Sequence, residues 1–111
     1  MSKATPVNDA TFAAEVLSSE IPVLVDFGAD WCMPCRIIEP VVSDIADEYA
    51  GRAKVFSLDV DSAPSIAAKY GIRGVPSLLF FKGGQEVGRI VGVQPKAEIT
   101  RVLDALLGAP V

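Results

Sequence analysis

The chain of 111 residues contains no histidine, only two cysteines and no apolar run of membrane-spanning length. The lack of histidine excludes histidine-based acid–base catalysis and histidine-containing metal sites. Because no apolar run approaches the roughly 18 residues of a membrane span, no membrane association is expected. The first nine residues contain no apolar core of signal-peptide length, so we expect a cytoplasmic protein.

The charge balance is mildly acidic, with 10 Lys and Arg against 14 Asp and Glu and a net charge of −4. No basic patch stands out, so nucleic acid is not an expected partner. Hydrophobic residues make up 50% of the chain, which favours a packed globule over disorder. We therefore expect a single domain spanning residues 1–111, with a sizeable core, and a monomer.

Helical and strand patterns alternate along the chain. The expected helices are residues 8–17, capped by Asn8 or Asp9; the cysteine pair to about Tyr49, kinked at Pro40; Asp61 or Ser62, as the cap, to Tyr70; and a last helix from Pro95. The expected strands cover residues 22–27, 54–60, 77–82 and 85–91, the last two forming a hairpin across Gly83-Gly84. This order predicts an α/β fold with a mixed central sheet, parallel strands first and a C-terminal antiparallel hairpin last, flanked by four helices.

Both cysteines lie in one short run between a strand pattern and a helix, Trp31-Cys32-Met33-Pro34-Cys35-Arg36. A thiol at the start of a helix faces unpaired N–H groups and the positive end of the helix dipole, and both favour the reactive thiolate. The second cysteine follows one turn later, close enough to form a disulfide. In a reducing compartment this spacing suggests redox catalysis. The alternative is a zinc half-site, for which two cysteines supply too few ligands.

Asp26 interrupts an otherwise apolar strand where a core residue would be expected. Burial disfavours the charged form of a carboxyl group, so a buried Asp26 should have a raised pKa. The alternative is a carboxylate on a solvent-facing position of the strand.

From about Phe12 to Leu107 the chain resembles the thioredoxin family. The matching pieces are Val25-Asp26-Phe27, Trp31-Cys32-x-Pro34-Cys35-Arg36, Pro40, Asp59-Val60-Asp61, Tyr70-Gly71-Ile72-Arg73-Gly74-Val75-Pro76-Ser77, the Gly83-Gly84 turn, and Val91-Gly92 before Pro95-Lys96. The resemblance implies the thioredoxin fold and a protein-disulfide reductase that a thioredoxin reductase recharges. It also implies disulfide-containing protein substrates and no bound metal or organic cofactor.

The resemblance implies a role for each residue of the site. Cys32, at the exposed end beside Trp31, is expected to attack the substrate disulfide, and Cys35 to resolve the mixed disulfide. Asp26 is expected to lie beneath Cys35 and relay its proton. Pro34 fits the first helical turn and stiffens the ring that the two sulfurs close, and Pro76 is expected to follow Val75 in a cis peptide bond that faces the disulfide. The expected docking surface for substrate comprises Trp31, Met33, Val60, Gly74, Val75, Gly92 and Val93.

Three positions depart from the family pattern. Met33 stands where glycine is usual, and we expect its side chain to be exposed and to alter redox poise or partner choice. Gly28 stands where an aromatic residue is common, and Ser57 where a lysine often faces the buried aspartate. The loss of that cation would raise the pKa of Asp26 further. Two other functions stay open: a thiol oxidase or isomerase of the same fold, and a non-redox binding subunit.

Overall fold

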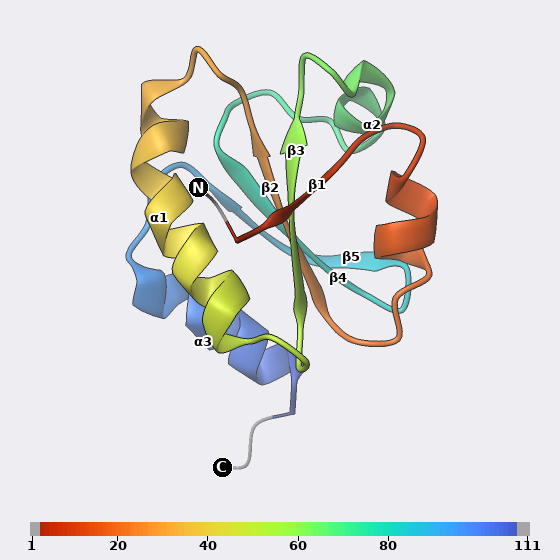
Figure 1. The fold of residues 1–111 in the computed structure, drawn as a ribbon, viewed down its shortest axis with the longest axis vertical. Helices are drawn as coiled ribbons and strands as arrows, with labels where there is room; N and C mark the ends of the chain where they lie inside the picture. Colours follow the sequence, from red (N-terminus) through yellow and green to blue (C-terminus); the bar gives the residue numbers. More distant parts are fainter. Residues whose placement is uncertain (1–2, 109–111) are drawn as a thin grey trace.

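The structure is a computed structural model that describes residues 3–108; residues 1–2 and 109–111 of the expected domain lie outside the described residues. A five-stranded sheet has the order β1-β3-β2-β4-β5 and helices on both faces (Figure 1). The strands are β1 (Thr5–Val7), β2 (Val23–Gly28), β3 (Lys54–Asp59), β4 (Ser77–Lys82) and β5 (Gln85–Val91). The helical elements are η1 (Ala13–Leu17), α1 (Met33–Glu48), α2 (Pro64–Lys69) and α3 (Lys96–Leu106).

The strand pairing confirms the predicted mixed sheet. Strands β1 and β2 both pair with β3 in parallel, whereas β4 pairs antiparallel with β2 and with β5. Gly83 and Gly84 join β4 to β5 with φ values of 60° and 79°, the left-handed conformations that a tight hairpin turn favours. The antiparallel hairpin therefore lies where the sequence predicted it.

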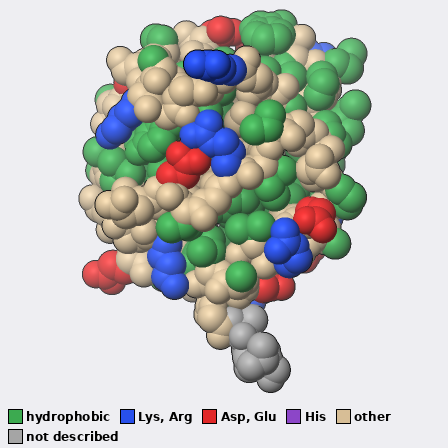
Figure 2. Space-filling model, turned by 180° about the vertical axis from the view of Figure 1, so that it is seen from behind, with side chains coloured by type: hydrophobic (Ala, Val, Ile, Leu, Met, Phe, Trp, Pro, Cys, Tyr) green, Lys and Arg blue, Asp and Glu red, His purple; other side chains and the backbone are tan. Residues whose placement is uncertain are grey.

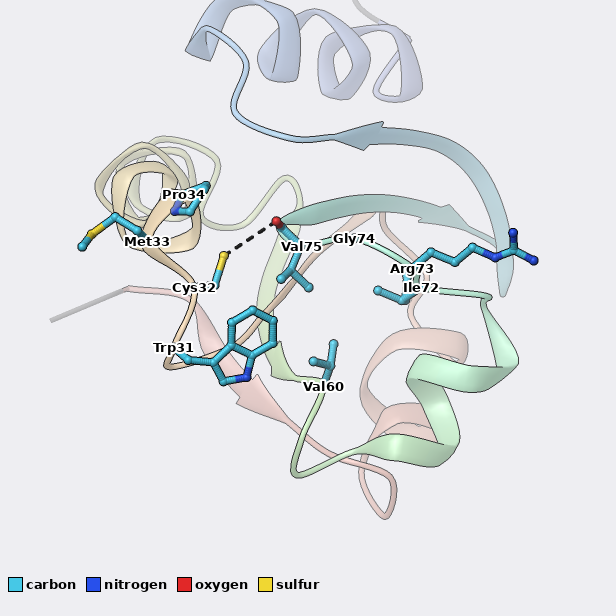
Figure 3. A pocket seen from close by; sticks show the side chains of 9 residues that line it. All are labelled: Trp31, Cys32, Met33, Pro34, Val60, Ile72, Arg73, Gly74 and Val75. Atoms are coloured by element: carbon cyan, nitrogen blue, oxygen red, sulfur yellow. Dashed lines mark hydrogen bonds between the residues drawn. The ribbon is translucent and has the colours of Figure 1, made fainter.

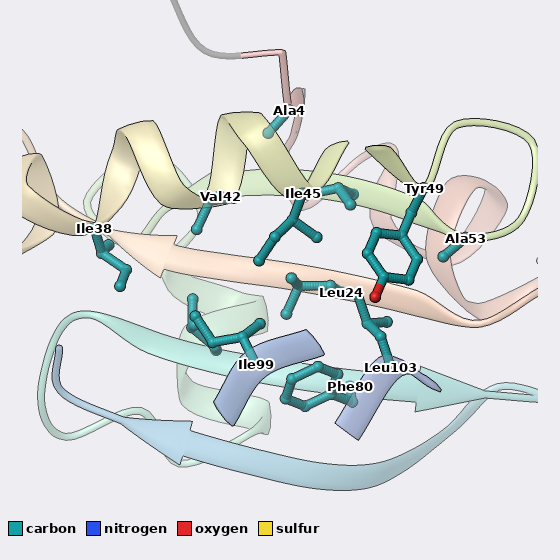
Figure 4. Packing of buried hydrophobic residues seen from close by; sticks show 12 residues of the cluster. Ala4, Leu24, Ile38, Val42, Ile45, Tyr49, Ala53, Phe80, Ile99 and Leu103 are labelled. Carbon is teal, nitrogen blue, oxygen red and sulfur yellow. The ribbon is translucent and has the colours of Figure 1, made fainter. Parts of the chain in front are cut away.

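Two apolar clusters fill the two faces of the sheet. On one face, α1 and α3 pack over Leu24 and Phe80 (Figure 4). On the other, η1 and α2 pack over Val25 and Phe27. Because β2 is covered on both faces, both sets of its alternating side chains are apolar except Asp26. Asp26 shares the α1 face with Leu24, so it points toward the helix that carries the cysteines.

The surface seen in Figure 2 mixes side chains of every class. Acidic and basic groups are scattered over it among hydrophobic ones, with no broad patch of one sign. Across the described residues, no helix is long and apolar enough to cross a membrane.

Two N-terminal elements differ from the sequence prediction. Strand β1 was not predicted, because three residues that include a proline carry little strand signal. The first helix is also shorter than expected: only Ala13–Leu17 forms a regular element, and it is a π-helix. Asn8 caps the turn before it by accepting hydrogen bonds from the backbone N–H groups of Ala10 and Thr11.

The predicted cap of the third helix was wrong, since neither Asp61 nor Ser62 caps α2. Asp59 holds both of these residues in the loop, accepting from the Asp61 N–H and from the Ser62 hydroxyl. The cap comes instead from Asp9, whose carboxylate accepts hydrogen bonds from the N–H groups of Ser65 and Ile66 at 3.3 and 3.0 Å. A side chain more than fifty positions away in the chain supplies this cap, so no local pattern could predict it.

Candidate active site

Cys32 and Cys35 form a disulfide at the start of α1, with their Cα atoms 5.3 Å apart. Cys32 is the N-cap residue, and its sulfur accepts a hydrogen bond from the Cys35 N–H at 3.2 Å. Pro34 lies in the first turn, where the missing N–H leaves no helical hydrogen bond unmade. In the reduced protein the same N–H groups and the helix dipole favour a thiolate at Cys32.

The expected exposure of Cys32 is wrong for the disulfide form. Cys32 is only 4% exposed and Cys35 is 8% exposed. Both belong to a small apolar cluster with Ala29, against which Val60 and Val75 pack. Cys32 therefore borders a groove rather than open solvent.

That groove, here called the Trp31 groove, has a volume of about 550 Å³ (Figure 3). It is lined by Trp31, Cys32, Met33, Pro34, Val60, Ile72, Arg73, Gly74 and Val75. The Cys32 sulfur lies 3.7 Å from the carbonyl oxygen of Val75 on the opposite wall. Trp31 is 71% exposed, and its indole N–H donates to Asp61 at 2.8 Å, which orients the ring. The groove thus places an exposed aromatic ring and the Val75 carbonyl oxygen beside the Cys32 sulfur.

The expected cis peptide bond between Val75 and Pro76 is confirmed. Around it the Ser77 hydroxyl donates to the Gly74 carbonyl oxygen at 2.6 Å, and the Gly92 N–H donates to the Pro76 carbonyl oxygen at 2.9 Å. Gly92 has a φ of 88°, a left-handed conformation that a side chain would strain. Hydrogen bonds from Ser77 and from Gly92 therefore fix the loop that faces the disulfide.

Apart from Cys32 and Pro34, which were predicted as catalytic residues, the lining of the groove differs from the predicted docking surface in four residues. Gly92 and Val93 do not line it, although Gly92 supports its wall. Ile72 and Arg73 do line it and were not predicted as site residues. Their signal was available, since both directly precede Gly74 in the loop that leads to the cis bond. Met33 is 65% exposed, as expected, and it is one of the residues that line the groove (Figure 3).

Asp26 is buried, which confirms the sequence prediction and excludes the solvent-facing alternative. The residue is 9% exposed, and its Oδ1 atom has no hydrogen-bond partner among the described residues. Burial, and to a smaller extent the negative charge of Glu39, raises the pKa of Asp26 to about 7. A carboxyl group with this pKa exchanges protons readily near neutral pH.

Asp26 opens onto a second cavity of about 500 Å³, here called the acid pocket. It is lined by Asp26, Gly28, Ala29, Asp30, Cys35, Arg36, Glu39, Ser57, Leu58 and Asp59. Cys35 and Glu39 could have been paired from sequence, because residues four apart share one face of a helix. The place of Ser57 could not, since it depends on the register that sets Ser57 beside Asp26 between β2 and β3.

Among residues 3–108 no group of three or more cysteine, aspartate or glutamate side chains is placed to hold a metal ion. The two sulfurs are bonded to each other. A bonded cysteine pair can undergo dithiol–disulfide exchange, and the Asp26 carboxyl group lines the same pocket as Cys35.

Comparison with known proteins adds a family match and close relatives. The family model described as Thioredoxin matches residues 3–105. The chain is 50% identical over 104 residues to thioredoxin 1 of Nostoc sp., covering 94% of this chain and 97% of the relative. It is 52% identical to thioredoxin 1 of Synechococcus elongatus over the same shares of both chains. It is 49% identical to the chloroplastic M-type thioredoxin of Chlamydomonas reinhardtii, covering 95% of this chain and 75% of the relative.

Proposed function

Since this chain belongs to the thioredoxin family, we propose how its residues divide the work of dithiol–disulfide exchange. The protein is a thiol–disulfide oxidoreductase with a redox-active pair at Cys32 and Cys35. Its working direction is the reduction of protein disulfides, with electrons returned to the pair by a thioredoxin reductase. The observation that carries this is the cysteine pair at a helix N-terminus beside the Trp31 groove.

Cys32 is the attacking nucleophile. Its thiolate bonds to one sulfur of the substrate disulfide, whose other sulfur leaves as a thiolate. Cys35 then loses its proton and attacks the Cys32 sulfur. The second substrate sulfur leaves with the bonding electron pair, and the disulfide of the oxidised protein is formed. The order is supported by the position of Cys32 at the N-cap and in the wall of the groove.

Asp26 is the proton acceptor for Cys35. Its carboxyl group lines the same pocket as Cys35, and a pKa of about 7 suits it to both take up and release a proton at neutral pH. Pro34 keeps the first turn of α1 rigid during both bond changes.

The substrate chain docks in the Trp31 groove. An extended segment there can pair its backbone with the loop before Pro76, as an added strand does. Trp31, Met33, Val60, Gly74 and Val75 form the contact surface, and Gly92 and Val93 flank it. Arg73 adds a positive charge at the end of the groove away from Cys32 (Figure 3).

The protein acts as a monomeric single domain of 111 residues in the cytoplasm, and it needs no bound metal or organic cofactor. One family model matching residues 3–105 supports the single domain. A sedimentation measurement checks the monomer, and a dimer would contradict it. Chloroplast relatives make the compartment worth testing directly by fractionating the source cells.

Insulin reduction coupled to NADPH and a thioredoxin reductase tests the proposal. We expect steady turnover with the native chain and none with Cys32→Ser. Equilibration with dithiothreitol or glutathione buffers tests the direction, since a disulfide reductase has a lower potential than an isomerase or an oxidase. A pair that oxidises reduced proteins and is not recharged by the reductase would establish an oxidase instead.

A further inference from the structure

The acid pocket carries negative charge that no cation of the chain neutralises. Four carboxyl groups line it, and Arg36 is the one basic residue in its lining. Arg36 donates to the backbone carbonyl oxygen of Asp30. In the part of the chain that the structure describes, neither Arg36 nor any of the four carboxyl groups takes part in an ion pair. Because a cavity lined by charges of one sign concentrates their field, the pocket attracts cations.

The four carboxyl groups come from separate elements. Asp26 lies on β2, Asp30 in the loop before α1, Glu39 on α1 and Asp59 at the end of β3. Among residues 3–108 no three such groups are placed to hold a metal ion, which needs several oxygen ligands at about 2.0 to 2.6 Å. Negative charges spread along a cavity instead match an elongated cation whose positive groups are themselves separated.

Asp26 shows independently that a partner is missing. Its side chain is nine-tenths buried, and Oδ1 has no hydrogen-bond partner among the described residues. Its neighbours across the sheet are the neutral Ser57 on β3 and the apolar Leu78 on β4. On α3, the other helix of this face, Lys96 pairs with Glu48 at the far end of α1. A buried polar atom without a partner costs free energy, so a charged N–H donor that enters the pocket gains from meeting it.

Gly28 leaves room for such a donor. A Cβ atom built on Gly28 would lie 4.0 Å from Oδ1 of Asp26 and 3.4 Å from the Cys35 sulfur. The φ of Gly28 is not positive, so its backbone does not require glycine, and the space beside Asp26 results from the missing side chain. The pocket volume of about 500 Å³ lies within the range of small-molecule sites, about 300 to 1,000 Å³.

We propose that the acid pocket binds a small organic cation with two or more primary ammonium groups, an alkyl diamine or polyamine. One ammonium group occupies the space beside Gly28 and donates to the Asp26 carboxylate, and another donates to the carboxylate of Glu39. An ammonium group has three N–H donors and no acceptor, so it suits a wall of carboxylates. The pocket and the Trp31 groove share no lining residue, so the bound cation leaves the groove free.

The test titrates the oxidised protein with diaminobutane and follows the backbone amide resonances by NMR. The pH is held above the Asp26 pKa of about 7, where the carboxyl group is ionised and an alkyl ammonium group, with a pKa of about 10, is still charged. We expect saturable shifts confined to the pocket lining, a weaker effect from butylamine, and none from the uncharged butanediol. Shifts that do not saturate, or that sodium chloride at equal ionic strength reproduces, would overturn the proposal.

Matched variants locate the bound cation. Glu39→Gln and Asp47→Asn each remove one exposed negative charge from α1, but of the two residues only Glu39 lines the pocket. We expect Glu39→Gln to weaken diaminobutane binding by about fivefold, the scale of one partly exposed ion pair, and Asp47→Asn to leave it near the native value. Equal weakening in both variants, or none in either, would overturn the site.

Gly28→Leu fills the space beside Asp26 without changing any charge, so it should abolish the binding of diaminobutane. Its amide spectrum shows whether the variant is folded, and if it is not, the comparison of Glu39→Gln with Asp47→Asn decides alone. Native affinity in a folded Gly28→Leu variant would contradict the proposed position of the ammonium group.

The last measurement asks whether the bound cation meets Asp26. A cation beside a carboxyl group favours its ionised form, so saturating diaminobutane should move the Asp26 titration midpoint to lower pH. By reciprocity, binding should tighten as the pH rises through that midpoint, and Asp26→Asn should remove this dependence. Saturable binding with an unchanged Asp26 midpoint would show that the cation lies elsewhere and would overturn the proposal.

Discussion

The two cavities beside the disulfide are lined by different kinds of residue. The Trp31 groove is walled mainly by apolar side chains and loop backbone, with Arg73 as the charged residue among those that line it. The acid pocket, of similar volume, is walled by four carboxyl groups, one arginine and a glycine. The pair thus has one face suited to holding a polypeptide and another suited to moving protons.

This difference suggests how one cysteine pair can serve both the attack on the substrate disulfide and the release of the substrate. Attack by Cys32 needs a substrate chain held against it, which apolar surface and backbone hydrogen bonds provide. Release by Cys35 needs a base, and in the proposed mechanism the buried carboxyl group of Asp26 is that base. A substitution in one cavity tests whether the chemistry on the other side of the disulfide also changes.

The largest expected effect comes from replacing one cysteine at a time with serine. Cys32→Ser should abolish disulfide reduction, whereas Cys35→Ser should accumulate mixed disulfides on Cys32, because nothing is left to resolve them. Mass spectrometry after incubation with a disulfide substrate measures the adducts, and the double variant is the control. A comparable yield of adduct on Cys35 in the Cys32→Ser variant would reverse the two roles and the assignment of the two cavities.

The next largest effect concerns the free energy of unfolding, which should depend on pH because Asp26 is buried. Its pKa of about 7 lies above the ordinary 3.8, so the fold favours the protonated carboxyl group. The stabilisation is complete below about pH 3.8, falls as the pH rises, and is gone above about pH 7. The shift corresponds to about 4 kcal/mol, at about 1.4 kcal/mol for each pKa unit.

Asp26→Ala should therefore stabilise the oxidised protein at neutral and higher pH while slowing thiol exchange. Its free energy of unfolding relative to the native chain should rise by several kcal/mol, of order 4, between about pH 4 and pH 8. Urea unfolding at both pH values measures this. Asp47→Asn, on the exposed side of α1, is the control and should show little pH dependence. A constant difference between Asp26→Ala and the native chain at all pH values would contradict a buried acid at this site.

The smallest effect on the fold is expected on the groove side, from Met33→Gly. The side chain is exposed in the first turn of α1 and away from both core clusters, so stability should change by less than about 1 kcal/mol. Its neighbour Cys32 makes the redox potential the more sensitive quantity, since a change of about 30 mV is a tenfold change in the equilibrium. Potentials from dithiothreitol buffers and kinetics with a thioredoxin reductase measure the effect. Identical values in both proteins would show that Met33 is neutral, while the titration of Asp26 should stay unchanged in either case.

Much of the site was predictable because its signals are local. The cysteine spacing, the helix start at Pro34 and the turn at Gly83-Gly84 all act over a few residues, and the structure confirms each. Asp26 stood out as the one charge in an apolar strand, which favoured a buried position over a solvent-facing one, and the structure confirms the burial. The cis bond before Pro76 came from the family resemblance rather than from any local preference.

What was missed depends on segments that meet only in the folded chain. Asp9 caps α2 across more than fifty residues, and β1 exists as a strand because β3 pairs with it. The cysteines are covered by Ala29, Val60 and Val75, so Cys32 is buried where the sequence predicted it to be exposed.

The amino-acid sequence by itself determined the reactive groups. These are two thiols one helical turn apart at the start of a helix, and a carboxyl group in a strand whose other side chains are apolar. Only the tertiary structure decided what each group faces. The pairing of β2 with β3 sets Ser57 beside Asp26, and the packing of α1 on the sheet brings Glu39 to the same pocket. Thiol chemistry is a property of the residue, whereas proton affinity and access depend on the charges and free space around it, and those come from distant parts of the chain.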